Sequence, residues 1–223
     1  MVKTIPDGVA PGRDAANLSV MGYDPSVYLT GRSPLEAASI GIEMKDTDVA
    51  FRTNLITLKG DGPYEELTIE DHSAGDISTE EADQLIAAVN RELGDETRQF
   101  FTGVSYRHCL IVHHGSTDYE LTPPHDVLTK PVGDHLPKGE GSAFITDMMK
   151  TSYGILKEHP VNKRRVEKGL NPANTIWIWG QGRKPALTSF SEKFGITGVA
   201  ISAVDLIKGI AICAGLDSVD VEG

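Results

Sequence analysis

The sequence has few cysteines and no long apolar run, and each absence narrows the class of protein. Its 223 residues include two cysteines, Cys109 and Cys213, each inside an apolar stretch. Thiols in such surroundings favour buried side chains in a reducing cytoplasm over a disulfide framework. No apolar run approaches the roughly 20 residues of a membrane span, and the N-terminus lacks a signal-peptide pattern. We therefore expect a cytoplasmic protein that does not enter a membrane.

Basic residues are also scarce relative to acidic ones. With 21 Lys and Arg against 32 Asp and Glu, the formal net charge is -11. A surplus of this sign argues against nucleic acid or an anionic membrane surface as a partner. A small anionic metabolite stays compatible with it, because a few converging Arg and His side chains set the local field.

The familiar cofactor and metal signatures are missing as well. There is no P-loop, no paired-cysteine motif and no H-E-x-x-H, which removes the usual nucleotide and zinc signals. The stretch 180–184 (GQGRK) resembles a glycine-rich phosphate loop only loosely, because it lacks the third glycine and Pro185 stands where a helix should begin. We interpret it as a structural turn.

What is present predicts alternating strands and helices. Strand-like runs occupy 49–58, 104–113, 175–179, 198–202 and 218–221, and helical patterns occupy 143–158, 161–168 and 203–214. Further helices begin at Asp14, expected as a cap, at a capping box of Ser33 to Glu36, and at a second box of Ser78 to Glu81. The alternation predicts an α/β fold with mixed sheets and flanking helices, and a parallel strand–helix–strand unit near the end.

Arg and His residues gather at strand ends and at bends rich in Gly and Pro. They occur in YRH (106–108), PPHD (123–126) and DHSAG (71–75), and as a pair at 164–165 after Pro160. Each alone is more typical of a surface charge or a hydrogen-bonded structural histidine. Together they predict a site for a small anionic metabolite, because Arg forks onto carboxylate and phosphate while His donates or moves a proton near neutral pH.

Longer segments carry a more specific signal. Eight such segments follow one another through nearly the whole chain: PGRDAANLSVMGYDP, YLTGRSPLEAASIG, VAFRTNLIT, DHSAGDIS, GVSYRHCLIV, TPPHDVL, HPVNKRRVEKGLNPANTIWIWGQGRKP and GVAISAVDLIKGI. They resemble, in order, successive motifs of the archaeal-type cofactor-independent phosphoglycerate mutases, which are metal-dependent isomerases of the alkaline phosphatase superfamily. The resemblance implies cytoplasmic work in glycolysis and gluconeogenesis, with phosphoglycerate as the substrate.

The same resemblance implies a fold and a mechanism. It implies a phosphatase-like α/β core with a two-metal site, binding Mn or Mg, and a serine nucleophile, plus an inserted domain that grips the glycerate. The phosphoryl group would move between the 2- and 3-oxygens through a phosphoserine. Residues 1–45 and 181–223 are then expected to be arms of an incomplete core, and 46–180 the inserted domain. Unpaired sheet edges on such arms would favour self-association.

The chain departs from the family pattern at several points. No strand ending in an Asp-Gly metal motif precedes Lys3, and the family's remaining Asp and His ligands are missing after Gly223. Arg13 stands where the nucleophile serine belongs, and guanidinium stays protonated. Asp76 stands where the family more often has His. We therefore predict an internal fragment that binds no metal and is inactive alone.

The resemblance also assigns candidate residues. Arg13 occupies the nucleophile position without its function, and Lys208 would lie near the nucleophile, although a solvated helix position explains Lys208 equally well. The predicted substrate contacts are Arg107, His108, Arg164 and Arg165, then Arg52, His72 and His125, with Asp14, Asn17 and Arg32 facing the reaction centre.

Two other functions are compatible with these motifs. Some bacterial members of the family are proposed homoserine kinases, so the parent could be a related phosphotransferase. Alternatively, the chain is a natural non-catalytic protein that binds an anionic metabolite. The flanking coding sequence, and assays with homoserine and ATP against 3-phosphoglycerate, discriminate these hypotheses.

Overall fold

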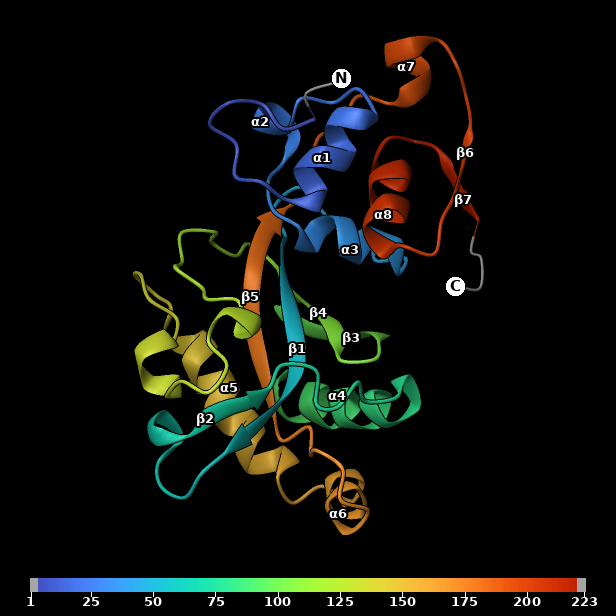
Figure 1. Ribbon diagram of the computed structural model, residues 1–223. Coiled ribbons are helices and arrows are strands. Elements are labelled where there is room, and N and C mark those ends of the chain that lie inside the picture. The colour runs from blue at the N-terminus through green and yellow to red at the C-terminus, as the bar shows by residue number, and fades with distance from the viewer. Residues whose placement is uncertain (1–3, 220–223) are drawn as a thin grey trace. The chain divides into compact units, whose positions relative to one another are not determined.

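The computed structural model describes residues 4–219, which divide into two compact units (Figure 1). The first unit combines Met1–Ala50 with Gly182–Gly223, and the second is Phe51–Gln181. The predicted α/β fold with mixed strands and flanking helices is confirmed.

In chain order the elements are α1 (Arg13–Val20), α2 (Pro25–Tyr28), α3 (Ser33–Ser39), β1 (Val49–Lys59), η1 (Tyr64–Glu66), β2 (Thr68–Asp71), α4 (Thr79–Leu93), β3 (Arg98–Val104), β4 (Arg107–Val112), η2 (Pro124–Asp126), η3 (Val132–His135), α5 (Ala143–Leu156), α6 (Pro160–Glu167), β5 (Thr175–Arg183), α7 (Phe190–Phe194), β6 (Val199–Ile201), α8 (Asp205–Cys213) and β7 (Asp217–Val219).

One five-stranded sheet forms the centre of the second unit. Its strand order is β2-β1-β4-β3, and β5 also pairs with β1. The pairs β1–β2 and β3–β4 are antiparallel. Every residue of β1 except Lys59 is buried, including the polar Arg52 and Asn54. The helix α4 packs on β3 and also contacts α5 and α6.

Two expectations for this region are wrong. The run 104–113 is not one strand, because the chain turns at Ser105, whose φ of 56° is left-handed, and the segment before the turn forms β3. The stretch 180–184 is not an isolated turn, because β5 continues through Arg183. Glycine is required within it at Gly182, where an added Cβ would lie 2.6 Å from the Thr30 carbonyl oxygen.

The first unit has a small core of its own. Its buried cluster consists of Leu18, Tyr23, Leu35, Leu206, Ile210 and Ala214. Helices α3 and α8 pack closely, so that a Cβ on Gly209 would lie 1.8 Å from the Leu35 carbonyl oxygen. Strands β6 and β7 pair in parallel, as predicted for the strand–helix–strand unit. The predicted strand 218–221 ends in residues 220–221, which lie outside the described residues.

The predicted helix caps were right in one place and wrong in two. At α4, Ser78 Oγ accepts the Glu81 amide at 3.2 Å, which confirms the serine half of that box. At α1, Gly12 is the cap and Asp14 lies in the first turn. At α3, Ser33 is already helical and Arg32 is the N-cap, so the predicted cap position is wrong, and Arg32 Nε donates to the Glu36 carboxylate at 2.7 Å.

The cysteine prediction is also settled for the described part of the chain. Cys109 and Cys213 form no disulfide, and Cys109 is buried while Cys213 is half-buried. Burial raises the pKa of the Cys213 thiol to about 11, against a smaller opposing effect of Lys184. Among residues 4–219, no helix has both the length and the apolar character to cross a membrane.

Candidate functional site

Strand β1 supplies the floor of one polar cluster in the second unit. Arg52 and Asn54 lie two residues apart and therefore share a face of the strand. The Arg52 Nε donates to Asn54 Oδ1 at 3.3 Å, and the Trp179 Nε1 of β5 donates to the same oxygen at 3.1 Å. The Arg52 guanidinium lies over the Trp179 ring, 5.1 Å from its centroid. Both Arg52 and Asn54 are buried.

Two histidines, a tyrosine and a second arginine complete this cluster. Asn54 Nδ2 donates to the His72 carbonyl oxygen at 3.3 Å. The His72 ring meets the Tyr106 ring edge-on at 5.8 Å and the His125 ring at 6.2 Å, measured between centroids. His125 in turn lies 5.5 Å from the Trp179 ring, which closes a circuit of contacts. Arg107 lies over Tyr106 at 5.8 Å. We call this set the Arg–His cluster: Arg52, Asn54, His72, Tyr106, Arg107, His125 and Trp179.

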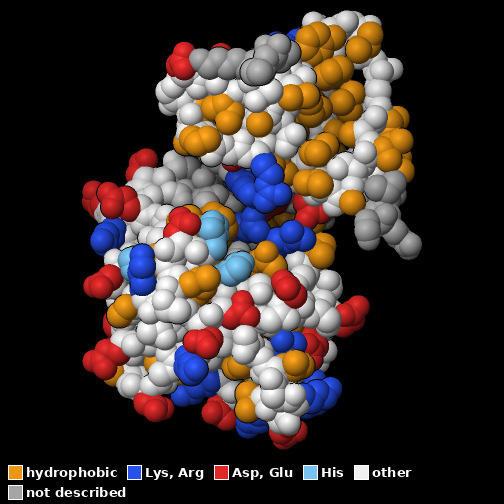
Figure 2. All heavy atoms as spheres, in the orientation of Figure 1, with side chains coloured by type: hydrophobic (Ala, Val, Ile, Leu, Met, Phe, Trp, Pro, Cys, Tyr) orange, Lys and Arg blue, Asp and Glu red, His pale blue; other side chains and the backbone are white. Residues whose placement is uncertain are grey.

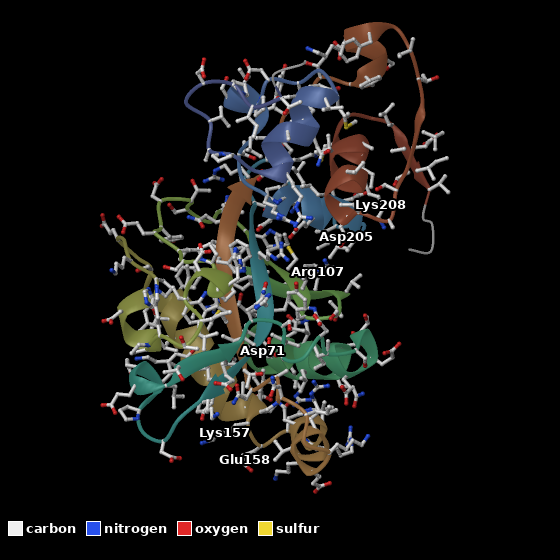
Figure 3. The ribbon with its side chains drawn as sticks, in the orientation of Figure 1. Asp71, Arg107, Lys157, Glu158, Asp205 and Lys208 are labelled. Atoms are coloured by element: carbon white, nitrogen blue, oxygen red, sulfur yellow. The ribbon has the colours of Figure 1, made fainter. Side chains whose placement is uncertain are left out.

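The cluster combines charge, titratable groups and an aromatic wall. Figure 2 shows histidine side chains exposed on the face in view, and Figure 3 places Asp71, beside His72 in the chain, and Arg107 on separate elements of this unit. His125 also lies beside a carboxylate, with Nε2 3.7 Å from Asp126 Oδ1. Guanidinium forks and imidazole N–H groups bind carboxylate and phosphate oxygens, so the arrangement suits a small anion.

His108 lies deeper than its neighbour Arg107. It is 4% exposed, and its Nδ1 accepts the Gly103 amide at 3.2 Å, which places the proton on Nε2. Within the described residues this buried Nε2 has no hydrogen-bond partner. Burial, with a smaller effect of the Arg107 charge, lowers the pKa of His108 to about 3. His108 is therefore a neutral donor at physiological pH, and its direct contact with substrate stays a prediction.

The pair Arg164 and Arg165 separates on α6. Arg164 is exposed, and Arg165 is 4% exposed. Each nitrogen of the Arg165 guanidinium already has an acceptor: Asn171 O for Nε at 2.8 Å, Ala74 O for Nη2 at 2.6 Å, and the Glu81 carboxylate for Nη1. These contacts describe an anchor for the backbone around Ala74. Direct substrate contact by either arginine stays a prediction.

The remaining candidates lie in the first unit. Arg13, Asp14 and Asn17 lie on α1, and Arg13 is exposed at its first position. Arg32 pairs with Glu36. Lys208 Nζ lies 3.7 Å from Asp205 Oδ1, and both side chains project from α8 (Figure 3). The roles assigned to these residues stay predictions.

Sequence reasoning did not include three members of the cluster. Asn54 had a usable signal, because its spacing from Arg52 places both side chains on one strand face. Tyr106 stands in the noted YRH motif but was not singled out. Trp179 had no signal, because the run TIWIW at 175–179 indicates only a buried strand.

The family resemblance implies divalent metal ions, and the residues present do not fit them. Two-metal sites need converging Asp and His ligands. Between residues 4 and 219, no group of three or more His, Cys, Asp or Glu side chains lies close enough to hold an ion. We therefore derive no step through a metal held by this part of the chain.

The fold and the cluster together define an α/β protein that gathers Arg, His and aromatic side chains on one sheet-based unit. Comparison with known proteins is more specific. A sequence model of the 2,3-bisphosphoglycerate-independent phosphoglycerate mutase family matches residues 1–162. The chain belongs to this family.

Relatives from bacteria and archaea agree. The chain is 49% identical over 223 residues to a probable 2,3-bisphosphoglycerate-independent phosphoglycerate mutase of Geobacter sulfurreducens, and 50% identical over 224 residues to the mutase of Methanosarcina barkeri. Both matches cover 100% of this chain and 55% of the relative. The chain thus spans about half the length of the curated relatives that it matches.

Two solved structures share this fold. The cofactor-independent phosphoglycerate mutase of Thermoplasma acidophilum matches with a TM-score of 0.64 and 29% identity, over 96% of this chain and 58% of that one. A protein of Pyrococcus horikoshii matches with a TM-score of 0.70 and 26% identity, over 99% of this chain and 50% of that one.

Proposed function

We propose that this chain is the substrate-holding portion of a phosphoglycerate mutase that interconverts 3- and 2-phosphoglycerate. The observation that carries the proposal is the closed circuit of the Arg–His cluster, in which side chains from separate segments meet. Family membership supplies the reaction, and the cluster supplies a place where an anionic three-carbon acid can be held. The substrate belongs to glycolysis and gluconeogenesis, so we place the protein in the cytoplasm.

The cluster residues divide the work by their chemistry. Arg52 and Arg107 supply the positive charges that would attract the carboxylate or phosphate oxygens. The rings of His72 and His125 are suited to donate to the remaining oxygens and to orient the glycerate. Trp179 and Tyr106 form an apolar wall that limits water, which strengthens each charged contact. Holding the glycerate in this way would keep it in place while its phosphoryl group is detached.

The proposal assigns the phosphoryl-transfer chemistry to another portion of the whole protein. Arg13 stands at the serine position and cannot form a phosphoserine, because a guanidinium is protonated and a poor nucleophile. In addition, the part of the chain between residues 4 and 219 has no cluster of metal ligands. In the whole enzyme, divalent Mn or Mg would stabilise the attacking and leaving oxygens.

Binding of 3-phosphoglycerate to the 223-residue chain, measured by isothermal titration calorimetry, tests the holding role. We expect Arg52→Gln to lower the affinity by about tenfold or more, because it removes a charged donor. Arg91→Gln is the matched control, since Arg91 is an exposed arginine of α4 paired with Glu92. Absence of binding in the unmodified chain, or equal losses in both variants, would contradict the proposal.

An activity assay tests the second half of the proposal. Neither the chain nor its Arg13→Ser variant should turn over 3-phosphoglycerate with manganese or magnesium, because a serine alone does not supply the metal ligands. Turnover above a blank by the unmodified chain would show that a nucleophile exists elsewhere in it.

The kinase alternative is weaker than the mutase proposal. The relatives described above carry the mutase name, and no comparison supports a homoserine kinase or a purely regulatory binding protein. The same calorimetry decides between the substrates. Binding of homoserine and not of 3-phosphoglycerate would favour the kinase.

A further inference from the structure

The turn that carries His72 has an unusual backbone. It follows β2, and three consecutive residues in it have left-handed φ angles: 50° at Ala74, 67° at Gly75 and 48° at Asp76. Left-handed geometry suits glycine and is unfavourable for residues with a side chain. Only one of these three positions is glycine, so hydrogen bonds to the turn must hold it in shape.

The first support is the carboxylate of Asp71, directly before His72. Its Oδ1 accepts the Ser73 amide and the Ser73 hydroxyl, each at 2.8 Å, and its Oδ2 accepts the Gly75 amide at 2.6 Å. Ser73 Oγ then accepts the Asp76 amide at 3.2 Å. Partial burial alone would raise the pKa of Asp71, but the hydrogen bonds from Ser73, Asn171 and Gly75 lower it below its ordinary value. The charged carboxylate therefore organises the turn from within.

The second support comes from α6 and the segment after it. Asn171 Nδ2 donates to Asp71 Oδ2 at 2.9 Å, and Arg165 Nη2 donates to the Ala74 carbonyl oxygen at 2.6 Å. Arg165 is itself fixed, because its Nε donates to Asn171 O at 2.8 Å and its Nη1 pairs with Glu81. Arg165 thus joins α4, α6 and the turn.

We propose that Asp71, Asn171 and Arg165 are positioning residues that aim the His72 ring into the Arg–His cluster. His72 is held at its carbonyl oxygen by Asn54, but this hydrogen bond leaves the direction of the ring to the backbone of the turn. If the turn relaxed out of its left-handed geometry, the His72 ring would move away from Tyr106 and His125. The link to substrate affinity rests on the proposed function, whereas the link to ring geometry does not.

The test replaces Asp71 by asparagine in the 223-residue chain, which keeps the shape of the side chain and removes its charge. The matched control is Asp95→Asn. Asp95 holds a similar turn before β3, accepting the amides of Thr97 and Arg98 at 2.8 and 2.9 Å, and within the described residues no hydrogen bond joins it to the cluster. Two readouts are taken: nuclear Overhauser effects between the His72 ring and the Tyr106 and His125 rings without ligand, and the affinity for 3-phosphoglycerate.

Asp71→Asn should abolish these Overhauser effects and weaken 3-phosphoglycerate binding about tenfold, the size of one charged hydrogen bond, while Asp95→Asn changes neither. Asn171→Ala, which removes a single donor to Asp71, should produce a smaller change in the same direction. It also serves as the deciding variant if Asp71→Asn does not fold.

The outcomes separate this inference from the proposed function. If the Overhauser effects weaken in the Asp71 and Asn171 variants of a protein that never binds 3-phosphoglycerate, the positioning role is upheld and the proposed function is contradicted. Unchanged Overhauser effects in both variants would overturn the positioning role. An equal weakening in the Asp95 variant would also overturn it, because it would show a general effect on stability.

Discussion

The two units bury their apolar side chains to different degrees. In the second unit, strand β1 is buried on both faces, and Trp177 of β5 is fully enclosed. In the first unit, β6 and β7 are three residues each, with Val199 54% and Ile201 69% exposed. Figure 2 shows apolar side chains at the surface of that unit. Burial of apolar surface drives folding, so the second unit buries enough of it to be stable alone. The first unit leaves apolar side chains exposed, and its stability depends more on contacts made by that exposed surface.

The largest expected effect contrasts one buried and one exposed side chain. Trp177→Ala should destabilise the second unit by about 3–5 kcal/mol, through reduced burial and the cavity left behind. Ile201→Ala in the first unit should change stability by less than about 0.5 kcal/mol. Both changes in stability are measured by urea unfolding, with hydrogen exchange at β1 reporting on the second unit and at β6 on the first. A similar cost for the two variants would remove the contrast between the units.

The next effect examines the core of the first unit. Gly209→Ala should destabilise it by about 3 kcal/mol, because the new methyl group collides with the Leu35 backbone. Gly154→Ala is the matched control in the second unit, where a Cβ on α5 meets nothing within 4 Å. That variant should gain about 0.5–1 kcal/mol from helix propensity. Amide exchange in α3 and α8 provides the measurement, and normal protection in Gly209→Ala would contradict the packing described.

The third effect is a pH dependence of the second unit. The pKa of His108 is about 3 in the folded chain, below its ordinary 6.5, so the unfolded state takes up the proton first as the pH falls. The stability contributed by neutral His108 is complete above pH 6.5 and is lost progressively between 6.5 and 3. From pH 6.5 to about 5 the loss is roughly 2 kcal/mol, at about 1.4 kcal/mol per pH unit.

His108→Gln removes this titration and retains an acceptor for the Gly103 amide. Urea midpoints taken across the pH range should therefore fall less steeply in the variant than in the unmodified chain. Identical slopes would mean that the burial of His108 does not control the acid sensitivity.

The smallest effect compares two serine caps. Ser78 caps α4 and Ser189 caps α7, each accepting an amide at 3.2 Å. Ser78→Ala should cost about 1 kcal/mol, because α4 is part of the packed second unit. Ser189→Ala should cost less, since α7 has five residues and none is buried. Thermal unfolding of both variants measures the two losses of stability. A larger loss in Ser189→Ala than in Ser78→Ala would contradict this ranking of the units.

Local features of this fold could be predicted from the sequence, whereas contacts between distant segments could not. The strand-like run at 49–58 and the serine at 78 predict β1 and the start of α4 through local rules. The turn at Ser105 escaped prediction because a left-handed serine leaves no mark in a strand-like run. At α3, the helix begins one residue earlier than the capping rule predicts, with Arg32 as the N-cap in place of Ser33.

The candidate site shows the same division. Strand alternation explains why Arg107 and His108, although adjacent, have different surroundings. The contact between the His72 and His125 rings depends on the order of strands in the sheet and on the path of the loop that follows β4. For Arg164 and Arg165, helix geometry separates the two side chains, but the packing partner that buries Arg165 comes from α4 and the turn after β2.

The long sequence separation of the residues that hold the His72 turn also bears on how the protein forms during synthesis. Arg165 lies 91 residues after Ala74, and Asn171 lies 100 residues after Asp71. Contacts this far apart must overcome a large loss of chain entropy, and they cannot exist until both partners have left the ribosome. A nascent chain that ends before residue 165 already contains β1, α4 and the Asp71 contacts within the turn, but it lacks the donors of Arg165 and Asn171. The contacts of Arg165 and Asn171 that support the His72 turn therefore form late, after β1 to β4 have been synthesised.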